Sequence, residues 1–182
     1  MGNSGFTLLE MIVVIGIMSL VTSLVLASYP GISETLGVSR AAEEIASSVR
    51  QTQAYGLGVK EFGTGSGIFP GYGLYFDKTA PASYIFFADA NNNKQYDGSS
   101  EKISEMLIQG NAVIDDLCVD QKQIPAGSCG IANFSAVYLR PAPQVSLTSG
   151  GSPYSDAEIK IKGTRGTTKT IILWQSGQVT VE

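Results

Sequence analysis

A single carboxylate stands near the start of a long apolar run. Between Phe6 and Tyr29 the only charged side chain is that of Glu10. A carboxylate placed in lipid is costly unless a cation accompanies it, and two such charges attract each other strongly once water is removed. Glu10 is therefore a functional candidate, and the pattern predicts a cationic partner for it.

A second group of candidate ligands lies in the segment from Asp89 to Glu101. Carboxylates and amides at alternate positions could wrap Ca²⁺, which takes about six to eight oxygen ligands. Lys94 stands where a calcium loop usually has glycine, and Glu101 comes one residue late for the usual bidentate ligand. A polar hairpin connection is the alternative. The predicted ligands of this calcium cofactor are Asp89, Asn91, Asn93, Gln95, Asp97 and Glu101.

A local basic cluster follows near the C-terminus and consists of Lys160, Lys162, Arg165 and Lys169. Such a cluster could contact the phosphates of DNA. Four cations would give weak, salt-sensitive binding without sequence preference. A solvated hairpin face is the other interpretation.

The composition removes several classes of chemistry. The chain has no histidine, so there is no imidazole for a Ser-His-Asp triad, a Cys-His pair or a metal site. The net charge of -4 gives no general attraction to nucleic acid or to an anionic membrane surface. No nucleophile-base pair stands out, and we expect a protein that is not an enzyme.

One long helix has to position Glu10. Residues 6–29 are long enough to cross a hydrocarbon layer of ~30 Å and are predicted to be a transmembrane helix. Tyr29-Pro30-Gly31 predicts a kink or partial unwinding after it. Helical periodicity then resumes over residues 30–57, where Val38, Ala42, Ile45 and Val49 share one face. That face is expected to pack on a domain.

Residues 58–182 are predicted to be one exported, β-rich globular domain. The fold class is α+β: a long N-terminal helix, transmembrane and then amphipathic, packed on an antiparallel β-sheet or sandwich. The last two strands should form a hairpin that turns at Ser176-Gly177. The predicted strands are Tyr72–Asp77, Tyr84–Asp89, Lys102–Gln109, Val113–Val119, Asn133–Leu139, Val145–Leu147, Ala157–Lys162, Lys169–Trp174 and Gln178–Val181.

The two cysteines, Cys118 and Cys129, flank a short polar stretch. In an exported domain a disulfide between them is favoured over two free thiols. Such a bond would close a local loop.

The sequence Gly5-Phe6-Thr7-Leu8-Leu9-Glu10, followed by the apolar run, resembles the N-terminus of type IV pilins and type II secretion pseudopilins. The resemblance implies that residues 1–5 are a leader peptide, that a prepilin peptidase cuts after Gly5, and that Phe6 becomes N-methylated. It also implies that Glu10 meets the N-terminal amine of a neighbouring subunit. The leader departs from the class in having no Lys or Arg.

Within that class the chain is most similar to the GspH/FimT-type minor pseudopilins. The similarity rests on Ile85–Asp89 with the Asn-rich segment after it, on Phe134–Pro141, and on the closing Ser-Gly-Gln-Val-Thr-Val. It implies a structural subunit held in the inner membrane by one pass, with its domain exported, and later assembled into a pilus or pseudopilus. The implied partners are other pilin or pseudopilin subunits, the peptidase, the inner-membrane assembly platform and membrane lipid.

Three alternatives stay open. A DNA-binding minor pilin would use Lys160, Lys162, Arg165 and Lys169 for DNA uptake. A generic membrane-anchored exported β domain would need only the apolar run. An ordinary secretory signal would normally have a basic segment, a shorter apolar core and a small-residue cleavage site after that core.

Overall fold

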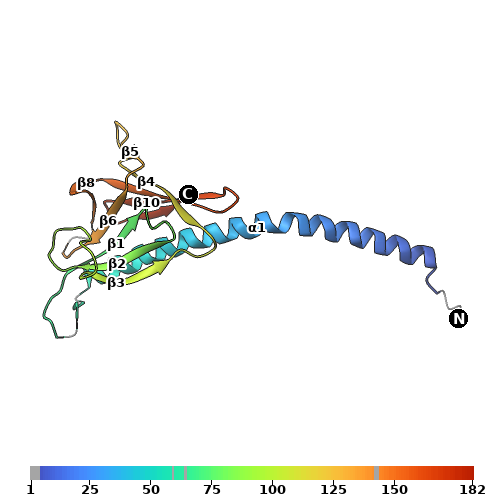
Figure 1. The fold of residues 1–182 in the computed structure, drawn as a ribbon, viewed down its shortest axis with the longest axis horizontal. Helices are drawn as coiled ribbons and strands as arrows, with labels where there is room; N and C mark the ends of the chain where they lie inside the picture. The colour runs from blue at the N-terminus through green and yellow to red at the C-terminus, as the bar shows by residue number, and fades with distance from the viewer. Residues whose placement is uncertain (1–4, 59, 64, 142–143) are drawn as a thin grey trace.

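A computed structural model describes residues 5–58, 60–63, 65–141 and 144–182. Residues 1–4 of the predicted leader lie outside the described residues. Figure 1 shows a long helix, α1, whose N-terminal half projects from a β-rich domain formed by the rest of the chain. The predicted α+β class is confirmed.

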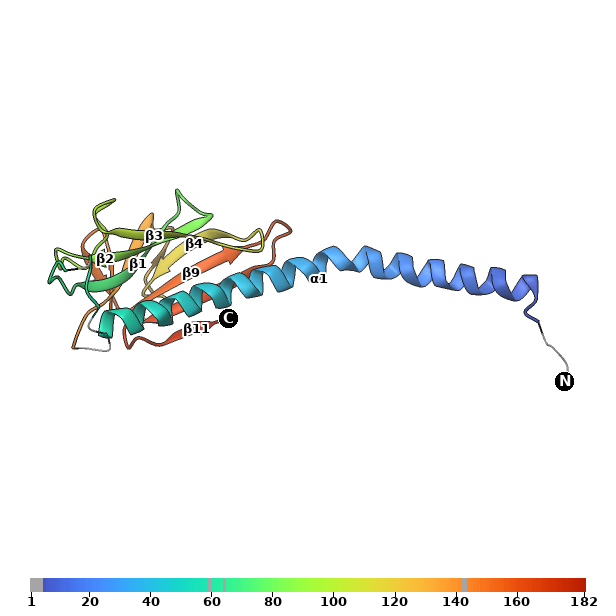
Figure 2. The same ribbon diagram turned by 90° about the horizontal axis from the view of Figure 1, so that it is seen from below.

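Helix α1 extends over Leu8–Leu57 without a break. Thr7 caps its N-terminus, and the backbone N–H of Gly58 donates to the carbonyl of Ala54 at its C-terminus. At ~1.5 Å per residue it is roughly 75 Å long. The predicted unwinding at Pro30 is wrong, because the helix continues through the proline and only curves gently (Figure 2). Proline removes one backbone hydrogen bond, and the turns on either side stay helical.

The two halves of α1 differ in burial. Side chains from Phe6 to Tyr29 are exposed, whereas the C-terminal half buries one face. That face includes the predicted Val38, Ala42, Ile45 and Val49. It contacts β1, β6, β9, β10 and β11, so the helix packs against strands of both sheets. Figure 2 shows α1 passing along one side of the domain.

The described residues contain eleven strands in two sheets, and every strand pair is antiparallel. The six-stranded sheet has the order β3-β2-β1-β6-β7-β8, and the five-stranded sheet has the order β11-β10-β9-β4-β5. The strands are β1 (Gly71–Asp77), β2 (Ser83–Asp89), β3 (Lys102–Leu107), β4 (Val113–Val119), β5 (Ser128–Cys129), β6 (Asn133–Tyr138), β7 (Val145–Ser149), β8 (Ser152–Tyr154), β9 (Asp156–Lys162), β10 (Thr168–Trp174) and β11 (Val179–Val181).

All nine predicted strands are present, with ends that shift by one or two residues. The predicted hairpin at Ser176-Gly177 joins β10 to β11, and Gly177 has a left-handed backbone (φ 89°) that suits its turn. The two short edge strands β5 and β8 were not predicted. They are only two and three residues long, which is too short to show an alternation of apolar and polar residues, and they are recognised by their pairing with a neighbouring strand.

One hydrophobic core joins the sheets to the helix. Phe76 of β1 stacks on Tyr84 and on Phe134, with ring centroids 5.4 and 5.2 Å apart. Ile159 of β9 and Ile171 of β10 supply the opposite sheet's side of this core. The buried face of α1 therefore completes a core that the strands alone would leave open.

Helix α1 approaches the domain closely at Gly56. A Cβ at that position would lie 2.5 Å from the Cβ of Tyr138 and closer still to its carbonyl oxygen. Both atoms belong to a buried residue in the middle of the sheet. Only glycine lets the helix lie this close to β6.

We expect Gly56→Ala to lower the free energy of unfolding by about 1–3 kcal/mol, because the added methyl overlaps a well-packed sheet. Thermal unfolding of the full chain in detergent measures this loss. Gly31→Ala, in the same helix with open space around it, is the matched control and should be neutral or raise stability by ~0.5–1 kcal/mol. Equal melting temperatures for the two variants would contradict the close contact.

Candidate functional site

The segment around the Gly5–Phe6 peptide bond lies outside the helix. Gly5, Phe6 and Thr7 are exposed and come before the first helical residue, Leu8. The Phe6 side chain is 74% exposed. Among the described residues, nothing lies within 4 Å of the place a Cβ would take on Gly5. The bond predicted to be cut is therefore open to an enzyme.

Glu10 lies in the first turn of α1, and its backbone N–H donates to the side chain of Thr7 at 3.2 Å. A carboxylate there complements the positive end of the helix dipole. In the described part of the chain, no Lys or Arg nitrogen lies within 4.0 Å of the Glu10 carboxylate. Within residues 5–182 as far as the structure describes them, no cation accompanies this acid.

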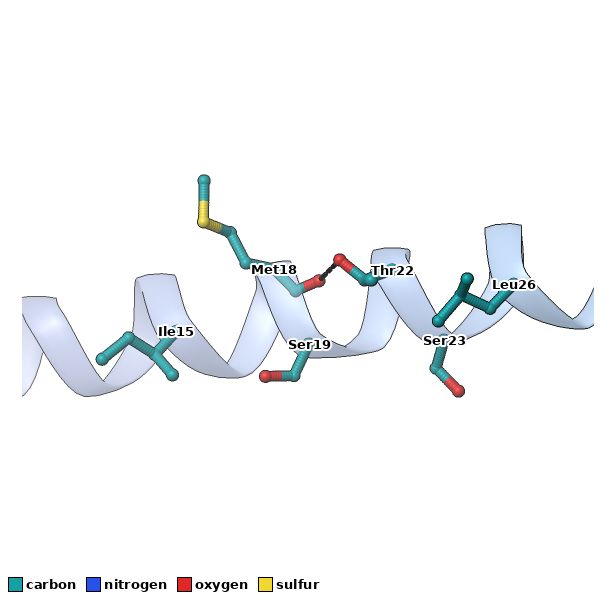
Figure 3. A pocket seen from close by; sticks show the side chains of 6 residues that line it. All are labelled: Ile15, Met18, Ser19, Thr22, Ser23 and Leu26. Carbon is teal, nitrogen blue, oxygen red and sulfur yellow. Dashed lines mark hydrogen bonds between the residues drawn. The ribbon is translucent and has the colours of Figure 1, made fainter.

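The helix surface around Glu10 is apolar and is not covered by the domain. A window of 18 residues in α1 has a mean hydropathy of 2.4 and is not buried, so by length and composition this helix could cross a membrane. Figure 3 shows Ser19 and Ser23 on the same side of it, while the Thr22 hydroxyl donates to the Met18 carbonyl at 2.8 Å. Small side chains on one side let a second helix approach closely.

The segment from Asp89 to Glu101 closes on itself through hydrogen bonds. The carboxylate of Asp89 accepts from the backbone N–H groups of Asn93 and Lys94 at 3.0 and 2.9 Å. Glu101 likewise accepts from two backbone N–H groups of the same segment. Burial raises the pKa of Asp89, although these amide hydrogen bonds oppose the change. Both acids are buried and hold the loop in shape.

The centre of this loop presents amide hydrogens toward Asp97. Asn91 and Asn93 each donate from Nδ2 to Asp97 Oδ2 at 2.6 Å, and their own oxygens accept from backbone N–H groups. Ca²⁺ would need those oxygens, so its binding requires both amides to rotate. Lys94 has a left-handed backbone (φ 66°) at the place where calcium loops use glycine. The calcium site stays a prediction.

The predicted disulfide between Cys118 and Cys129 is present. It joins β4 to β5 and closes a loop that projects from the domain in Figure 1. Asp116 and the two sulfurs lie within 4.8 Å of one another, but the sulfurs are bonded together and supply no thiolate for a metal. Their role is structural.

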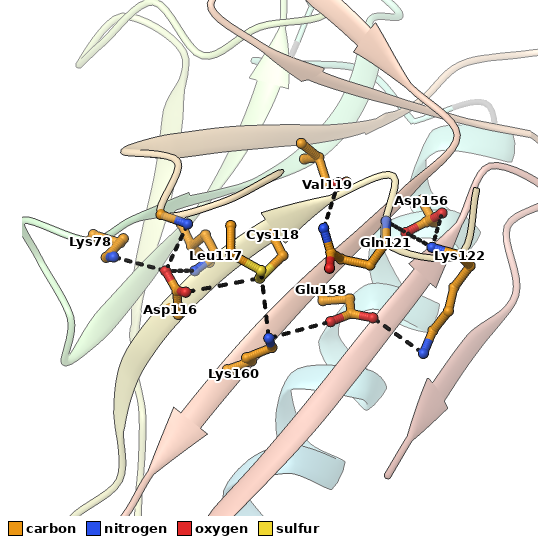
Figure 4. The surroundings of a disulfide bond; sticks show 12 residues. Lys78, Asp116, Leu117, Cys118, Val119, Gln121, Lys122, Asp156, Glu158 and Lys160 are labelled. Atoms are coloured by element: carbon orange, nitrogen blue, oxygen red, sulfur yellow. Dashed lines mark hydrogen bonds and ion pairs between the residues drawn. A yellow bond between two sulfur atoms is a disulfide. The ribbon is translucent and has the colours of Figure 1, made fainter. Parts of the chain in front are cut away.

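Asp116 anchors the strand beside the disulfide, as Figure 4 shows. Its Oδ1 accepts from Lys78 Nζ at 2.8 Å and from the backbone N–H groups of Leu117 and Gly130 at 2.9 and 3.1 Å. Partial burial raises the pKa of the Asp116 carboxyl, but these hydrogen bonds outweigh it and hold the pKa below its ordinary value. The carboxylate therefore fixes the position of the β5 segment.

The predicted basic cluster does not form an uncompensated positive surface. Lys160 lies 3.8 Å from Glu158, Lys162 lies 3.9 Å from Asp115, and Arg165 lies 3.9 Å from Glu34. Nearby carboxylates reduce the field that would attract a phosphate backbone. DNA binding by Lys160, Lys162, Arg165 and Lys169 stays a prediction.

Sequence reasoning missed Glu34, whose side chain is 7% exposed and accepts a hydrogen bond from the backbone N–H of Arg165 at 2.7 Å. The available signal was its place as the first charge after the apolar run. Its partner lies 131 residues further along the chain, and no local pattern relates the two.

Residues 1–26 match a family model described as the prokaryotic N-terminal methylation motif. The match covers the predicted cleavage site, Glu10 and most of the apolar run. Comparisons with curated proteins and with solved structures found no match.

The calcium prediction has a measurable consequence for stability. If Asp97 and its neighbours hold an ion, about 5 mM Ca²⁺ should raise the melting temperature of the full chain in detergent by roughly 2–4 °C relative to excess chelator. Asp97→Asn keeps the shape of the side chain and should abolish the rise. The same melting curve for the wild-type protein with Ca²⁺ and with chelator would reject the site.

The lowered pKa of Asp116 predicts how stability depends on pH. A carboxyl whose pKa is lower in the folded than in the unfolded state stabilises fully above the unfolded value and loses this stabilisation as the pH falls toward the folded value. We expect the free energy of unfolding to fall below pH ~4, the ordinary Asp value. Asp116→Asn should cost about 1 kcal/mol at neutral pH and show a shallower fall in acid.

The measurement is chemical unfolding of the full chain in detergent at several pH values. Asp115→Asn, at the adjacent and more exposed position, is the matched control and should keep the wild-type slope. A slope that is the same in all three proteins would show that Asp116 does not titrate differently on folding.

Proposed function

We propose that this type IV pilin-like chain, which carries the N-terminal methylation motif, is a minor pilin or pseudopilin. It is processed after Gly5, N-methylated at Phe6, and assembled through α1 into a pilus or a type II secretion pseudopilus. The observation that carries the proposal is Glu10, a lone carboxylate on an unburied apolar helix, a few residues beyond an open Gly5–Phe6 bond.

The chemistry of Glu10 supports assembly. Cleavage after Gly5 would expose an ammonium on Phe6. In an apolar layer the ammonium of one subunit and the Glu10 carboxylate of another attract each other strongly, while either charge alone is penalised. Pairing between subunits therefore favours association and fixes how far one helix is displaced along its neighbour.

The division of α1 into two halves supports the same role. The half that carries Glu10 buries nothing in its own domain, whereas the half beyond Val38 is fixed on the sheets. The unburied half remains free to pack against other helices, first in the membrane and then in a filament. Ser19 and Ser23 offer a side of small residues for that packing (Figure 3).

A structural role also accounts for the domain. The GspH/FimT-type resemblance implies a minor subunit, and a Gly-rich domain with long polar connections suits a specialised member rather than a uniform building block. The prepilin peptidase, the assembly platform and other pilin subunits are the partners that this role requires.

The experiment expresses the full chain with its peptidase and its filament partners, and recovers sheared filaments. We expect Glu10→Gln to reduce incorporation by at least about ten-fold, since the amide keeps the size but removes the charge. Glu43→Gln, an exposed acid in the domain half of the same helix, is the matched control and should assemble normally.

Mass analysis of the membrane form completes the test. Both variants and the wild-type protein should yield a mature chain that begins with N-methylated Phe6, so a loss of assembly is not a loss of processing. Normal incorporation of Glu10→Gln, or an uncut wild-type chain, would overturn the proposal.

A further inference from the structure

Two turns of the domain close on α1 where the helix leaves it, as Figure 2 shows. The turn between β3 and β4 lies against Gly37, and a Cβ on Gly110 would come within 2.6 Å of the Gly37 carbonyl oxygen. The turn between β9 and β10 also lies against the helix, and a Cβ on Gly163 would come within 2.8 Å of Val38 Cγ2. Both contacts depend on glycine, so the turns are seated directly on the helix.

A groove of about 720 Å³ lies between these turns and the helix. This is within the usual size of a ligand site, about 300–1,000 Å³. Its floor is the segment of α1 from Tyr29 to Arg40, and its walls carry Asn111 and Arg165. The end toward the N-terminus is apolar, because Ile32 and Tyr29 are exposed there. The groove thus joins an apolar surface to polar donors.

The charged side chains that line the groove are two guanidinium groups, those of Arg40 and Arg165, and the Glu34 carboxylate, which leaves a net positive charge. Arg40 is exposed, and in the described ranges no carboxylate lies within 4.0 Å of it. Arg165 is 59% exposed, and its Nε is 3.9 Å from Glu34 Oε2, too far for a hydrogen bond. The bidentate N–H groups of arginine match the geometry of a phosphate.

Glu34 is the positioning residue for this arrangement. Its Oε1 accepts from the backbone N–H groups of Arg165 and Thr167 at 2.7 and 3.4 Å. Its Oε2 is buried and has no hydrogen-bond partner among the described residues. The Glu34 carboxylate therefore fixes the turn that carries Arg165 through backbone hydrogen bonds, and it makes no side-chain hydrogen bond to the Arg165 guanidinium.

The groove begins where the predicted membrane-spanning part of α1 ends, because Tyr29 is among its lining residues. The predicted span is residues 6–29, and residues 30–33, which follow it, carry no charge. Glu34 is the next residue, and Arg40 follows about 9 Å further along the axis. Helical side chains tilt toward the N-terminus, so the Arg40 side chain leans back toward the membrane.

We propose that this groove binds the phosphate of an anionic phospholipid from the adjoining leaflet, held by Arg40 and Arg165. The apolar end beside Ile32 continues onto the lipid chains. Binding there fixes the height and rotation of the domain above the bilayer. The inference rests on the proposed function only in requiring that α1 spans a membrane.

The test is native mass spectrometry of the full chain in detergent, titrated with phosphatidylglycerol and, separately, with phosphatidylcholine. We expect the first phosphatidylglycerol to bind at least about five-fold more tightly than phosphatidylcholine. Each cation near a lipid surface contributes roughly a five-fold effect, so Arg40→Gln and Arg165→Gln should each lower that affinity by about five-fold. Arg165→Gln keeps the backbone N–H that Glu34 accepts, and its melting temperature checks the fold.

Arg50→Gln, an exposed arginine further along the same helix, is the matched control and should bind lipid as the wild-type protein does. Glu10→Gln should also bind normally, which separates this site from the proposed role in assembly. Equal affinity for the two lipids, or unchanged binding by both groove variants, would overturn the inference. So would complete displacement by about 10 mM inorganic phosphate, which would mark a simple anion site.

Discussion

The rest of the structure depends on one constraint. A single continuous helix has an apolar half that the domain does not cover and a second half that packs on the two sheets. The N-terminal half of α1 exposes apolar side chains in every direction, which suits lipid or other helices. The C-terminal half exposes polar residues and buries one face against both sheets. Because the backbone is helical throughout, the two halves of α1 form one continuous element.

Glycine sets how closely the domain holds this helix. At Gly56 the backbone meets β6, and at Gly37 it meets the turn that contains Gly110. Between these points the buried side chains are mostly small, such as Ala41, Ala42 and Ala46. Because the backbones approach closely at these glycines, short side chains are enough to fill the space between α1 and the domain. A larger residue at either glycine would push the helix away from the domain.

Buried or half-buried carboxylates hold the connections that the core does not reach. Glu34 fixes the turn between β9 and β10, and Asp116 holds the disulfide-linked segment beside β4. Asp156 does the same for the loop that the disulfide closes, accepting from the backbone N–H groups of Gln121 and Lys122. Each acid accepts hydrogen bonds from backbone N–H groups of a loop or turn and so ties that segment to the domain. These three acids have a structural role in the domain and are not simply charges exposed to solvent.

The sequence by itself determined the features that repeat locally or stand next to one another. Alternation of apolar residues identified nine strands, a period near 3.6 identified the buried face of α1, and the cysteine spacing identified the disulfide. Gly5, Phe6 and Glu10 are likewise a local pattern. The strands, the helix face and the disulfide could be predicted because periodicity and short spacing fix which face a side chain occupies. The roles of Gly5, Phe6 and Glu10 stay predictions.

Only the tertiary structure decided which distant residues meet. The pairs Glu34 with Arg165, Lys78 with Asp116, and Gly56 with Tyr138 join segments that share no local pattern. Pro30 could not be judged from its own neighbours either, because one missing backbone bond does not end a helix whose flanking turns remain intact. Contacts of this kind depend on how the sheets and the helix pack as whole layers. That packing buries the Glu34 carboxylate at the end of the apolar run and brings the distant Arg165 beside it.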